Sequence, residues 1–375
     1  MTEQSRQTPW QDTRRWAWLA AWVIPLLPFV GWALFEASAS PWAWWVGPLV
    51  LYGLVPLLDH LLGDDPANPP ESAVEQLGRQ PFYRWVLYAW FPLHAAALLL
   101  ACWVVSQYSL GAVGWLGLMA STGLVSGGGI NVAHELGHKR DALARWLAKL
   151  ALAPAMYGHF FVEHNRGHHV RVATPEDPAS ARLGESFWRF LPRTIGGSLL
   201  SAWRLEAMRL GREQRSVLSW RNENLQAWSL SVLLFAGLVA LFGWQVLPLL
   251  VLQAGYGAAT LEVVNYIEHY GLLRQKLADG RYQRCQPCHS WNSNRRLTNL
   301  MLYQLERHSD HHAHPTRPYQ VLRHFEHSPQ LPAGYAALVP LAYCPPLWFR
   351  LMDRRVLAFY GGDRSRCNQG PSAQA

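Results

Sequence analysis

Charged residues are scarce in this chain. Asp, Glu, Lys and Arg make up 15% of the 375 residues, whereas hydrophobic residues make up 50% and include 20 Trp. This composition excludes an intrinsically disordered protein or one that coats nucleic acid, because such chains carry many charges and few aromatic residues. The apolar residues also gather in long runs, which favours a membrane protein over two soluble domains.

Cysteine is also rare. The five cysteines are an odd number, and one of them lies inside an apolar run. The sequence therefore predicts no disulfide framework, since such frameworks use paired cysteines in small secreted domains. The cysteines are Cys102, Cys285, Cys288, Cys344 and Cys367.

Six apolar stretches reach or approach the length needed to cross a bilayer. A hydrocarbon core of ~30 Å requires about 20 apolar residues in a helix. Trp residues cluster at several ends of these stretches, as in the aromatic belts of membrane interfaces. The first stretch is longer than the apolar part of a signal peptide, so we expect a retained helix. The six stretches are 16–35, 42–62, 85–105, 112–132, 227–244 and 246–267.

Lys and Arg are absent from three short loops between these stretches. Segments 35–42 and 106–111 and the turn near Trp244 contain neither residue, whereas the N-terminus and the long polar blocks are rich in Arg. By the positive-inside rule, the basic loops and both termini are cytoplasmic. The net charge of +8 then reflects topology and contact with anionic membrane lipids.

The expected fold is therefore an all-α integral membrane protein with six transmembrane helices. Its parts are a cytoplasmic N-terminus (1–15), four transmembrane helices (16–138), a cytoplasmic region (139–226), two transmembrane helices (227–270) and a cytoplasmic C-terminal region (271–375).

Histidine is abundant, and nine of the sixteen histidines fall in four segments expected at the cytoplasmic surface. In three of these segments histidines stand at i and i+4, which places two imidazoles on one helix face about 5–6 Å apart at Cβ. Chance accounts for one such group, but not for four groups at one membrane surface. The nine are His134 and His138 in the first segment, His164, His168 and His169 in the second, His269 in the third, and His308, His311 and His312 in the fourth.

Nine imidazoles are too many for one metal ion and suit two ions, each with four or five neutral nitrogen ligands. We expect this di-metal site to cap the helix bundle. Imidazole suits iron, copper, zinc and nickel, so the spacing alone leaves the metal open. Taken by itself, "HELGH" (134–138) also fits the His-Glu-x-x-His motif of zinc proteases.

Polar residues near the histidines are candidates for orienting them, because a ligating imidazole usually donates its second N–H to a carboxylate or a carbonyl. Four acids directly neighbour the histidines, namely Glu135, Glu163, Glu268 and Asp310. Glu262 and Asn265 precede His269 by seven and four residues, on the same helix face. The alternative roles are solvated charges at helix ends and hydrogen bonds within the bundle.

Two other features are weaker. His159 is a candidate spare ligand, but it has no partner at helical spacing. "CQPCH" (285–289) matches the haem-attachment pattern Cys-x-x-Cys-His. Covalent haem attachment belongs to the other side of the membrane, and two thiols alone make an incomplete zinc site. We therefore expect neither function.

The motifs together resemble those of the membrane-bound alkane 1-monooxygenases, within the wider class of membrane fatty-acid desaturases and hydroxylases. The resemblance rests on "HELGHK", "EHNRGHH" followed by "VATPEDPASAR", "NYIEHYGL" and "LERHSDHHAHPTRPYQ", and it covers roughly residues 15–360. One local departure is Glu306, where Gln is expected.

This resemblance implies a centre of two non-haem irons held by the nine histidines. It implies terminal hydroxylation of medium- to long-chain n-alkanes with O2 in the inner membrane of a bacterium. It also implies electrons from rubredoxin, which an NAD(P)H-dependent rubredoxin reductase reduces. No rubredoxin-like cysteine pairs are present, so we expect a separate donor.

The alkane is expected to enter from the bilayer between the apolar helices. Gly127, Gly128 and Gly129 precede the first histidine pair and would allow either an open passage or close helix packing. Leu51 is smaller than the Trp residues near it and would leave the channel deep. The acidic donor is expected to dock on a basic surface that includes Arg295, Arg296, Arg307, Arg317 and Arg323.

Other functions are weighed against this one. A hydroxylase of alkyl-aromatic side chains and a fatty-acyl desaturase or hydroxylase would use the same scaffold. A histidine-rich metal transporter should place ionisable residues near the bilayer midplane and often contains internal repeats. Here the histidines gather at one surface and no repeat is evident, which disfavours a transporter.

Overall fold

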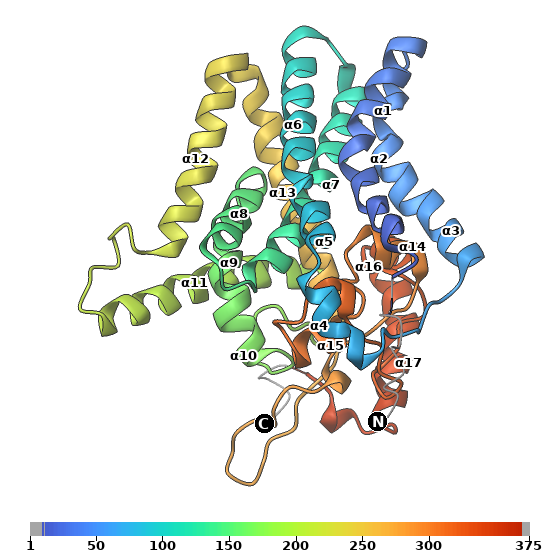
Figure 1. The fold of residues 1–375 in the computed structure, drawn as a ribbon, viewed down its shortest axis with the longest axis vertical. Helices are drawn as coiled ribbons and strands as arrows, with labels where there is room; N and C mark the ends of the chain where they lie inside the picture. Colours follow the sequence, from blue (N-terminus) through green and yellow to red (C-terminus); the bar gives the residue numbers. More distant parts are fainter. Residues whose placement is uncertain (1–9, 11, 370–375) are drawn as a thin grey trace, which may run out of the picture.

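The computed structural model describes residues 10 and 12–369, and within these residues the chain is helical, with only isolated β-bridges. Six helices in this part are long and apolar enough to cross a membrane, which confirms the predicted fold class (Figure 1). Parts of the predicted terminal regions, 1–9, 11 and 370–375, lie outside the described residues. The six spans are Arg15–Ser38, Pro41–Leu62, Pro81–Gln107, Gly111–Gly137, Glu223–Phe242 and Trp244–His269.

The spans stand side by side, and α7 (Gly111–Gly137) is the most deeply buried of them. It packs against α6 (Trp90–Gln107) and α13 (Leu247–His269). A Cβ on Gly257 would lie 3.0 Å from the carbonyl oxygen of Gly123, so glycine lets the two backbones touch. This packing fixes the ends of α7 and α13, and both ends carry predicted ligands.

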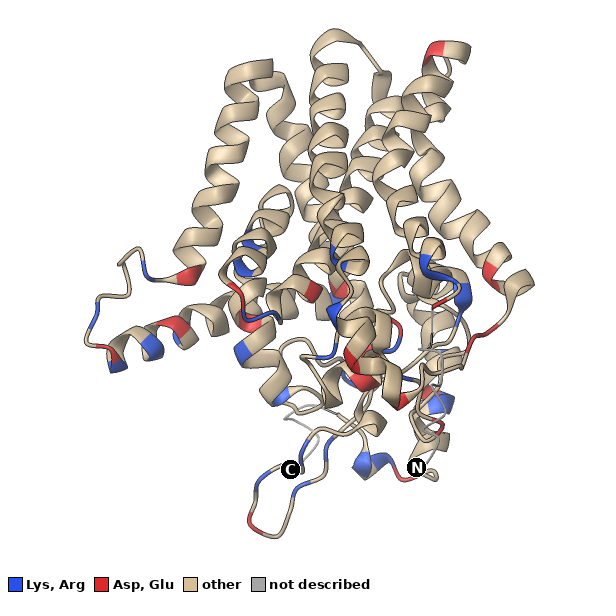
Figure 2. Cartoon of the chain, viewed as in Figure 1, with Lys and Arg blue, Asp and Glu red and all other residues tan. Residues whose placement is uncertain are grey.

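The charged residues are concentrated toward one end of the molecule. In the view of Figure 2, Lys and Arg are absent from the upper part of the bundle and lie from the level of α8 downward, where the loops and short helices gather. Glu36 lies near the C-terminal end of α1 (Val23–Ser38). The histidine motifs lie in this charged part of the molecule, as the loop composition predicts.

The second span is not a regular α-helix. It runs as the short helices η2 (Pro41–Trp45) and α2 (Val46–Leu49), a π-helical turn η3 (Val50–Leu54) and α3 (Val55–Leu62). Pro56 has no N–H to donate to the carbonyl of residue 52, which interrupts the α-helical ladder at this turn. The widened turn carries Leu51 and Tyr52, which both line a cavity inside the bundle.

The polar blocks fold into further helices, most of which are shorter than the spans. The first block contains α8 (Ala142–Leu152), α9 (Phe160–Glu163), the π-helical turn η5 (His164–His168), α10 (His169–Arg171) and α11 (Phe187–Arg212). The last block contains α14 (Arg296–Met301), α15 (His308–Ala313), α16 (Tyr335–Ala342) and α17 (Pro345–Phe359). Of the remaining helices, α4 (Glu71–Arg79) precedes the third span, α5 (Pro81–Tyr88) is the first part of that span, and α12 (Glu223–Phe242) is the fifth span.

A buried ion network holds the second histidine segment in place. Arg166, inside the π-helical turn η5, pairs with Glu206 of α11 at 2.5 Å and with Glu223 at the start of α12. Lys149 of α8 lies 3.0 Å from the same Glu223. Because the acids are buried, removal of one partner would leave an uncompensated charge, so the network fixes the turn that presents His164 and His168.

Candidate metal centre

The nine predicted histidines converge on one region from four separate segments of the chain. His134 lies near the end of α7 and His138 just beyond it, while His269 ends α13. The π-helical turn η5 and α10 carry the histidines of the second segment, and α15 carries those of the fourth. They form two clusters, a five-histidine cluster (His134, His138, His164, His169 and His311) and a four-histidine cluster (His168, His269, His308 and His312), and within each cluster the potential ligand atoms lie within 4.8 Å of one another.

In all nine imidazoles the Nε2 atom faces the other histidines of its cluster. In the five-histidine cluster the Nε2 atoms of His134 and His311 are 2.9 Å apart, and those of His138 and His164 are 3.1 Å apart. In the four-histidine cluster the Nε2 atoms of His308 and His312 are 2.8 Å apart. Two nitrogens about 2.1 Å from one metal ion lie roughly 3 Å apart when they are at right angles. The donor set therefore fits one ion in each cluster.

The protonation state of the ligands also fits metal binding. Burial, followed by the charge of neighbouring imidazoles, lowers the pKa well below the usual 6.5. Neutral imidazoles keep a free lone pair on one nitrogen, which a metal ion requires. This applies to the ligands outside the spans, His138, His164, His169, His308, His311 and His312.

The structure divides the sequence motifs between the two clusters. His164 and His168 are four residues apart and predict a pair on one face, yet His164 joins the five-histidine cluster with His169, and His168 joins the other. The π-helical turn over His164–His168 widens the helix, so residues five apart share a face. In α15, His308 and His312 stay together while His311 turns to the five-histidine cluster.

Most of the acids adjacent to the histidines form ion pairs with Lys or Arg side chains and do not orient the predicted ligands. Glu135 lies 2.5 Å from Lys139, Glu163 lies 2.5 Å from Arg171, and Asp310 lies 2.7 Å from Arg317. Neighbouring residues on a helix point roughly 100° apart, so an acid next to a ligand faces another direction.

Glu268 behaves differently from these three acids. Its Oε2 lies 3.1 Å from Nε2 of His308, and its Oε1 accepts a hydrogen bond from the hydroxyl of Tyr335 at 2.8 Å. Glu268 therefore contacts a ligand on its metal-facing nitrogen. It does not contact the outer nitrogen, where an orienting acid is expected.

Asp177 is a residue that the sequence reasoning missed. Its Oδ2 lies 2.9 Å from Nδ1 of His168, and it also accepts a hydrogen bond from Ser180. Burial raises its pKa, but His168 and the hydrogen bonds from His168 and Ser180 outweigh burial and hold the pKa at about 2. Asp177 lies nine residues from His168, which is no helical spacing. Its only signal in the sequence is its position in "VATPEDPASAR".

Glu262 and Asn265 lie close together inside the bundle. Glu262 accepts hydrogen bonds from the hydroxyls of Tyr157 and Thr194, both at 2.7 Å, and from the Asn265 amide at 3.3 Å. These contacts match the expected alternative of hydrogen bonding within the bundle. Both residues also line a small cavity that reaches His164 and His168.

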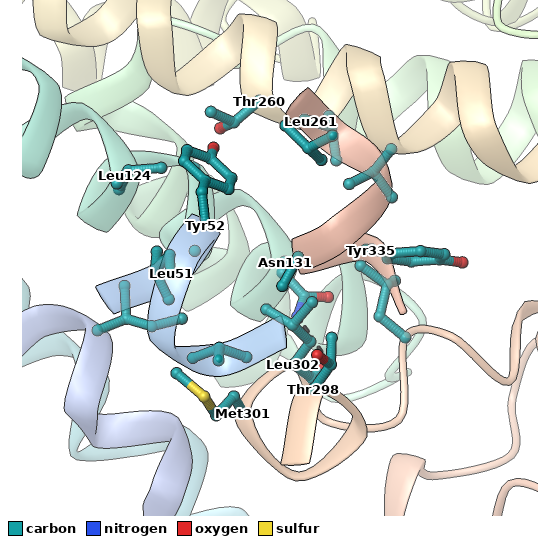
Figure 3. A pocket seen from close by; sticks show the side chains of 18 residues that line it. Leu51, Tyr52, Leu124, Asn131, Thr260, Leu261, Thr298, Met301, Leu302 and Tyr335 are labelled. Carbon is teal, nitrogen blue, oxygen red and sulfur yellow. Dashed lines mark hydrogen bonds between the residues drawn. The ribbon is translucent and has the colours of Figure 1, made fainter. Parts of the chain in front are cut away.

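An apolar cavity lies between the spans and α14 and α16 (Figure 3). Leu51, Gly127 and Gly128 line it, whereas a Cβ on Gly129 would meet His94 instead. Close packing is also present at these glycines, since a Cβ on Gly128 would lie 2.5 Å from Trp90. Gly127 and Gly128 therefore line the cavity and also allow close packing, and the passage of substrate along them stays a prediction.

The apolar cavity leads toward the five-histidine cluster. Asn131 and Leu305 line it and also line a second, smaller cavity whose walls include His134 and His311. Asn131 is held by a hydrogen bond from its amide to the carbonyl of Leu302 at 2.8 Å. An apolar chain in the cavity would thus end next to this cluster.

Of the five arginines expected on the docking surface, only Arg296 is exposed. Arg307 is buried and donates to the carbonyl oxygens of Leu322, Asp65 and Ala67. Arg317 pairs with Asp310, Arg323 with Glu71 and Arg295 with Asp64. Burial of arginines by distant segments of the chain is not visible in the local sequence.

Comparisons with known proteins show the family of this chain. The family model described as fatty acid desaturase matches residues 109–342. An alkane 1-monooxygenase of Acinetobacter baylyi is 45% identical over 97% of this chain and 90% of its own length. Alkane 1-monooxygenase 1 of Alcanivorax borkumensis is 47% identical over 96% of this chain and 89% of its own length.

A more distant relative has a different printed activity. The hydroxylase component of a xylene/toluene monooxygenase from Pseudomonas putida is 29% identical over 60% of this chain and 59% of its own length. The likeness to the alkane enzymes is stronger and covers almost the whole chain. The chain belongs to the fatty acid desaturase family and, within it, to the alkane 1-monooxygenases, membrane oxidoreductases that hydroxylate alkanes.

Proposed function

We propose that the chain hydroxylates the terminal carbon of medium- to long-chain n-alkanes at a centre of two non-haem irons, using O2 and electrons from reduced rubredoxin. Two observations carry this proposal: the two histidine clusters, and an apolar cavity that shares the lining residues Asn131 and Leu305 with a smaller cavity next to His134 and His311.

The five-histidine and four-histidine clusters would each hold one iron. Their ligands are neutral, which leaves the positive charge of the ions largely uncompensated. Iron would supply the redox chemistry that activates O2, which zinc, having no redox chemistry, does not. The protein's part is to fix the imidazoles, as Asp177 does for His168, and to exclude bulk water from the centre.

The substrate would be held by burial alone, because an alkane offers no polar group to bind. Leu51 on the π-helical turn η3 is part of the cavity wall and would help to set how long a chain fits. Asn131 and Leu305 would direct the end of the chain toward His134 and His311. Placing the chain end at the metals favours oxidation of the terminal carbon.

The proposed electron donor is a separate rubredoxin, reduced by an NAD(P)H-dependent rubredoxin reductase. The Lys and Arg residues lie in the part of the molecule that holds the histidines (Figure 2), which supports a cytoplasmic site and cytoplasmic termini in a bacterial inner membrane. Because most of the arginines first considered for docking are paired internally, we expect only a modest weakening of turnover by salt.

Reconstitution in lipid bilayers with rubredoxin and its reductase tests the proposal. The protein should convert octane to 1-octanol and hexadecane to 1-hexadecanol. The likeness to the xylene/toluene enzyme makes an alkyl-aromatic hydroxylase the second candidate. Faster oxidation of xylene than of either alkane would favour that candidate, and a dehydrogenated acyl product would favour a desaturase.

A further inference from the structure

The small cavity that Glu262 and Asn265 line, called the polar cavity below, lies beside the histidine clusters. It shares no lining residue with the apolar cavity. Its walls include His164 of the five-histidine cluster and His168 of the four-histidine cluster, so it touches both. It offers about 10 Å³ to the centre of a water molecule, which is close to the least space that holds one water.

Two residues that line this cavity each have a buried polar atom with no hydrogen-bond partner within residues 10 and 12–369. The two atoms are Nε2 of His159 and Oε2 of Glu163, and their residues are 4% and 3% exposed. Buried polar atoms are rarely left unpaired in folded proteins, and a buried water usually pairs them. A water molecule in this cavity would offer each of them a hydrogen-bond partner.

Further polar side chains from inside the helix bundle line the cavity. Glu262, Asn265 and Ser198 also line it. Arg171 binds Glu163 at 2.5 Å and Ser201 at 2.7 Å, and its side chain is 26% exposed. Glu163 therefore contacts a partly exposed arginine and also lines the cavity next to His164 and His168.

We propose that this cavity binds one ordered water, held by Nε2 of His159 and Oε2 of Glu163, and that this water is the last hydrogen-bonded step by which protons reach the histidine clusters. The second half of the proposal rests on the proposed function. The water site itself does not.

Alkane hydroxylation requires a route by which protons reach the histidine clusters. Alkane hydroxylation breaks the O–O bond and one C–H bond, forms a C–O and an O–H bond in the alcohol, and releases the second oxygen atom as water. Two electrons come from the one-electron donor protein and two protons from solvent. The apolar cavity offers few hydrogen-bonding groups along which protons would move, whereas the polar cavity is lined by several.

His159 is suited to this position. Burial lowers its pKa to about 4, so the ring is neutral and has one nitrogen that donates and one that accepts. It stacks edge-on against Tyr157 at 4.4 Å between ring centroids, and the hydroxyl of Tyr157 donates to Glu262. The imidazole is therefore fixed by packing beside the proposed water.

Ser198 provides a matched pair of variants for the test. Its side chain lines the cavity from α11, which carries none of the proposed ligands. Ser198→Ala removes the hydroxyl and keeps the space, whereas Ser198→Val removes the hydroxyl and fills the space with methyl groups. Only the valine variant should exclude the water.

A high-resolution map of the metal-loaded protein tests the site first. We expect density for a water within hydrogen-bonding distance of His159 Nε2 in the parent and in Ser198→Ala, and none in Ser198→Val. An empty cavity in the parent overturns the proposal whatever the protein oxidises. Metal analysis tests the irons separately, so the two failures are distinguishable.

The coupling of electrons to product tests the route. Ser198→Val should keep its metal, but its yield of product per electron should fall on the order of tenfold or more. It should release hydrogen peroxide and show a larger solvent isotope effect. Ser198→Ala should behave like the parent. Unchanged coupling in Ser198→Val overturns the route. If Ser198→Val loses metal, His159→Phe replaces it, and unchanged coupling there has the same meaning.

Discussion

Asp177 fixes the orientation of His168 from a loop outside the helices that carry the ligands. The carboxylate Oδ2 lies 2.9 Å from Nδ1 of His168, and Nε2 of the same ring lies 3.2 Å from Nε2 of His312 in the four-histidine cluster. Because Asp177 accepts the outer N–H, the metal-facing nitrogen is left with its lone pair.

Asp177→Asn should weaken the four-histidine cluster selectively. An amide of similar size no longer provides a negative charge for the outer N–H of His168, and loss of such a contact typically lowers metal affinity about 10–100-fold. Titration of the metal-free protein with ferrous iron should show one site at parental affinity and one weaker site. Equal weakening of both sites would mean that Asp177 supports the whole fold.

Leu51→Trp should shift the product distribution toward shorter alkanes. The larger side chain would occupy part of the apolar cavity that Leu51 lines. Leu54 lies on the same π-helical turn but is 47% exposed, so Leu54→Trp is a matched control that adds the same bulk outside the cavity. Competition among alkanes of several lengths, analysed by gas chromatography, measures the shift. A Leu51→Trp profile like that of the control would remove Leu51 from the substrate site.

Glu306→Gln should stabilise the protein most at alkaline pH. Glu306 is fully buried and accepts a hydrogen bond from the backbone N–H of Tyr335 at 2.5 Å, and desolvation raises its pKa from 4.5 to about 8. The folded state therefore keeps its proton while the unfolded state loses it above pH 4.5, so the stability contribution of Glu306 falls as pH rises toward 8. The neutral amide in Glu306→Gln does not titrate, so its contribution to stability does not fall as pH rises.

Thermal unfolding in detergent checks this prediction. The gain of Glu306→Gln over the parent should grow from pH 5 to pH 8 and reach on the order of a few kcal/mol. The comparison between the two proteins cancels the titration of the histidines. A gain that is independent of pH would show that Glu306 is ionised in the folded protein.

The sequence predicted the spans well because membrane insertion depends on local composition. Apolar length and loop charge do not require knowledge of the tertiary structure, and the six predicted stretches agree with the six helices to within a few residues at most of their ends. The convergence of the four histidine segments followed from their common position at one membrane surface.

The division of the ligands between two clusters could not be predicted. Regular α-helical spacing pairs His164 with His168, but the π-helical turn inserts one residue and pairs His164 with His169 instead. The contact between Asp177 and His168 depends on a loop conformation, and the burial of Arg307 depends on residues 65–67 and on Leu322. Local patterns carry no information about such contacts between distant segments.

The metal content of the purified protein tests the central claim most directly. Two clusters of neutral imidazoles predict about two irons per chain, and His312→Ala should leave about one, because it removes a ligand from the four-histidine cluster only. His327→Ala is the control, since His327 is exposed and belongs to neither cluster. Retention of both irons in His312→Ala, or an active parent that contains a single iron or only zinc, would contradict the account.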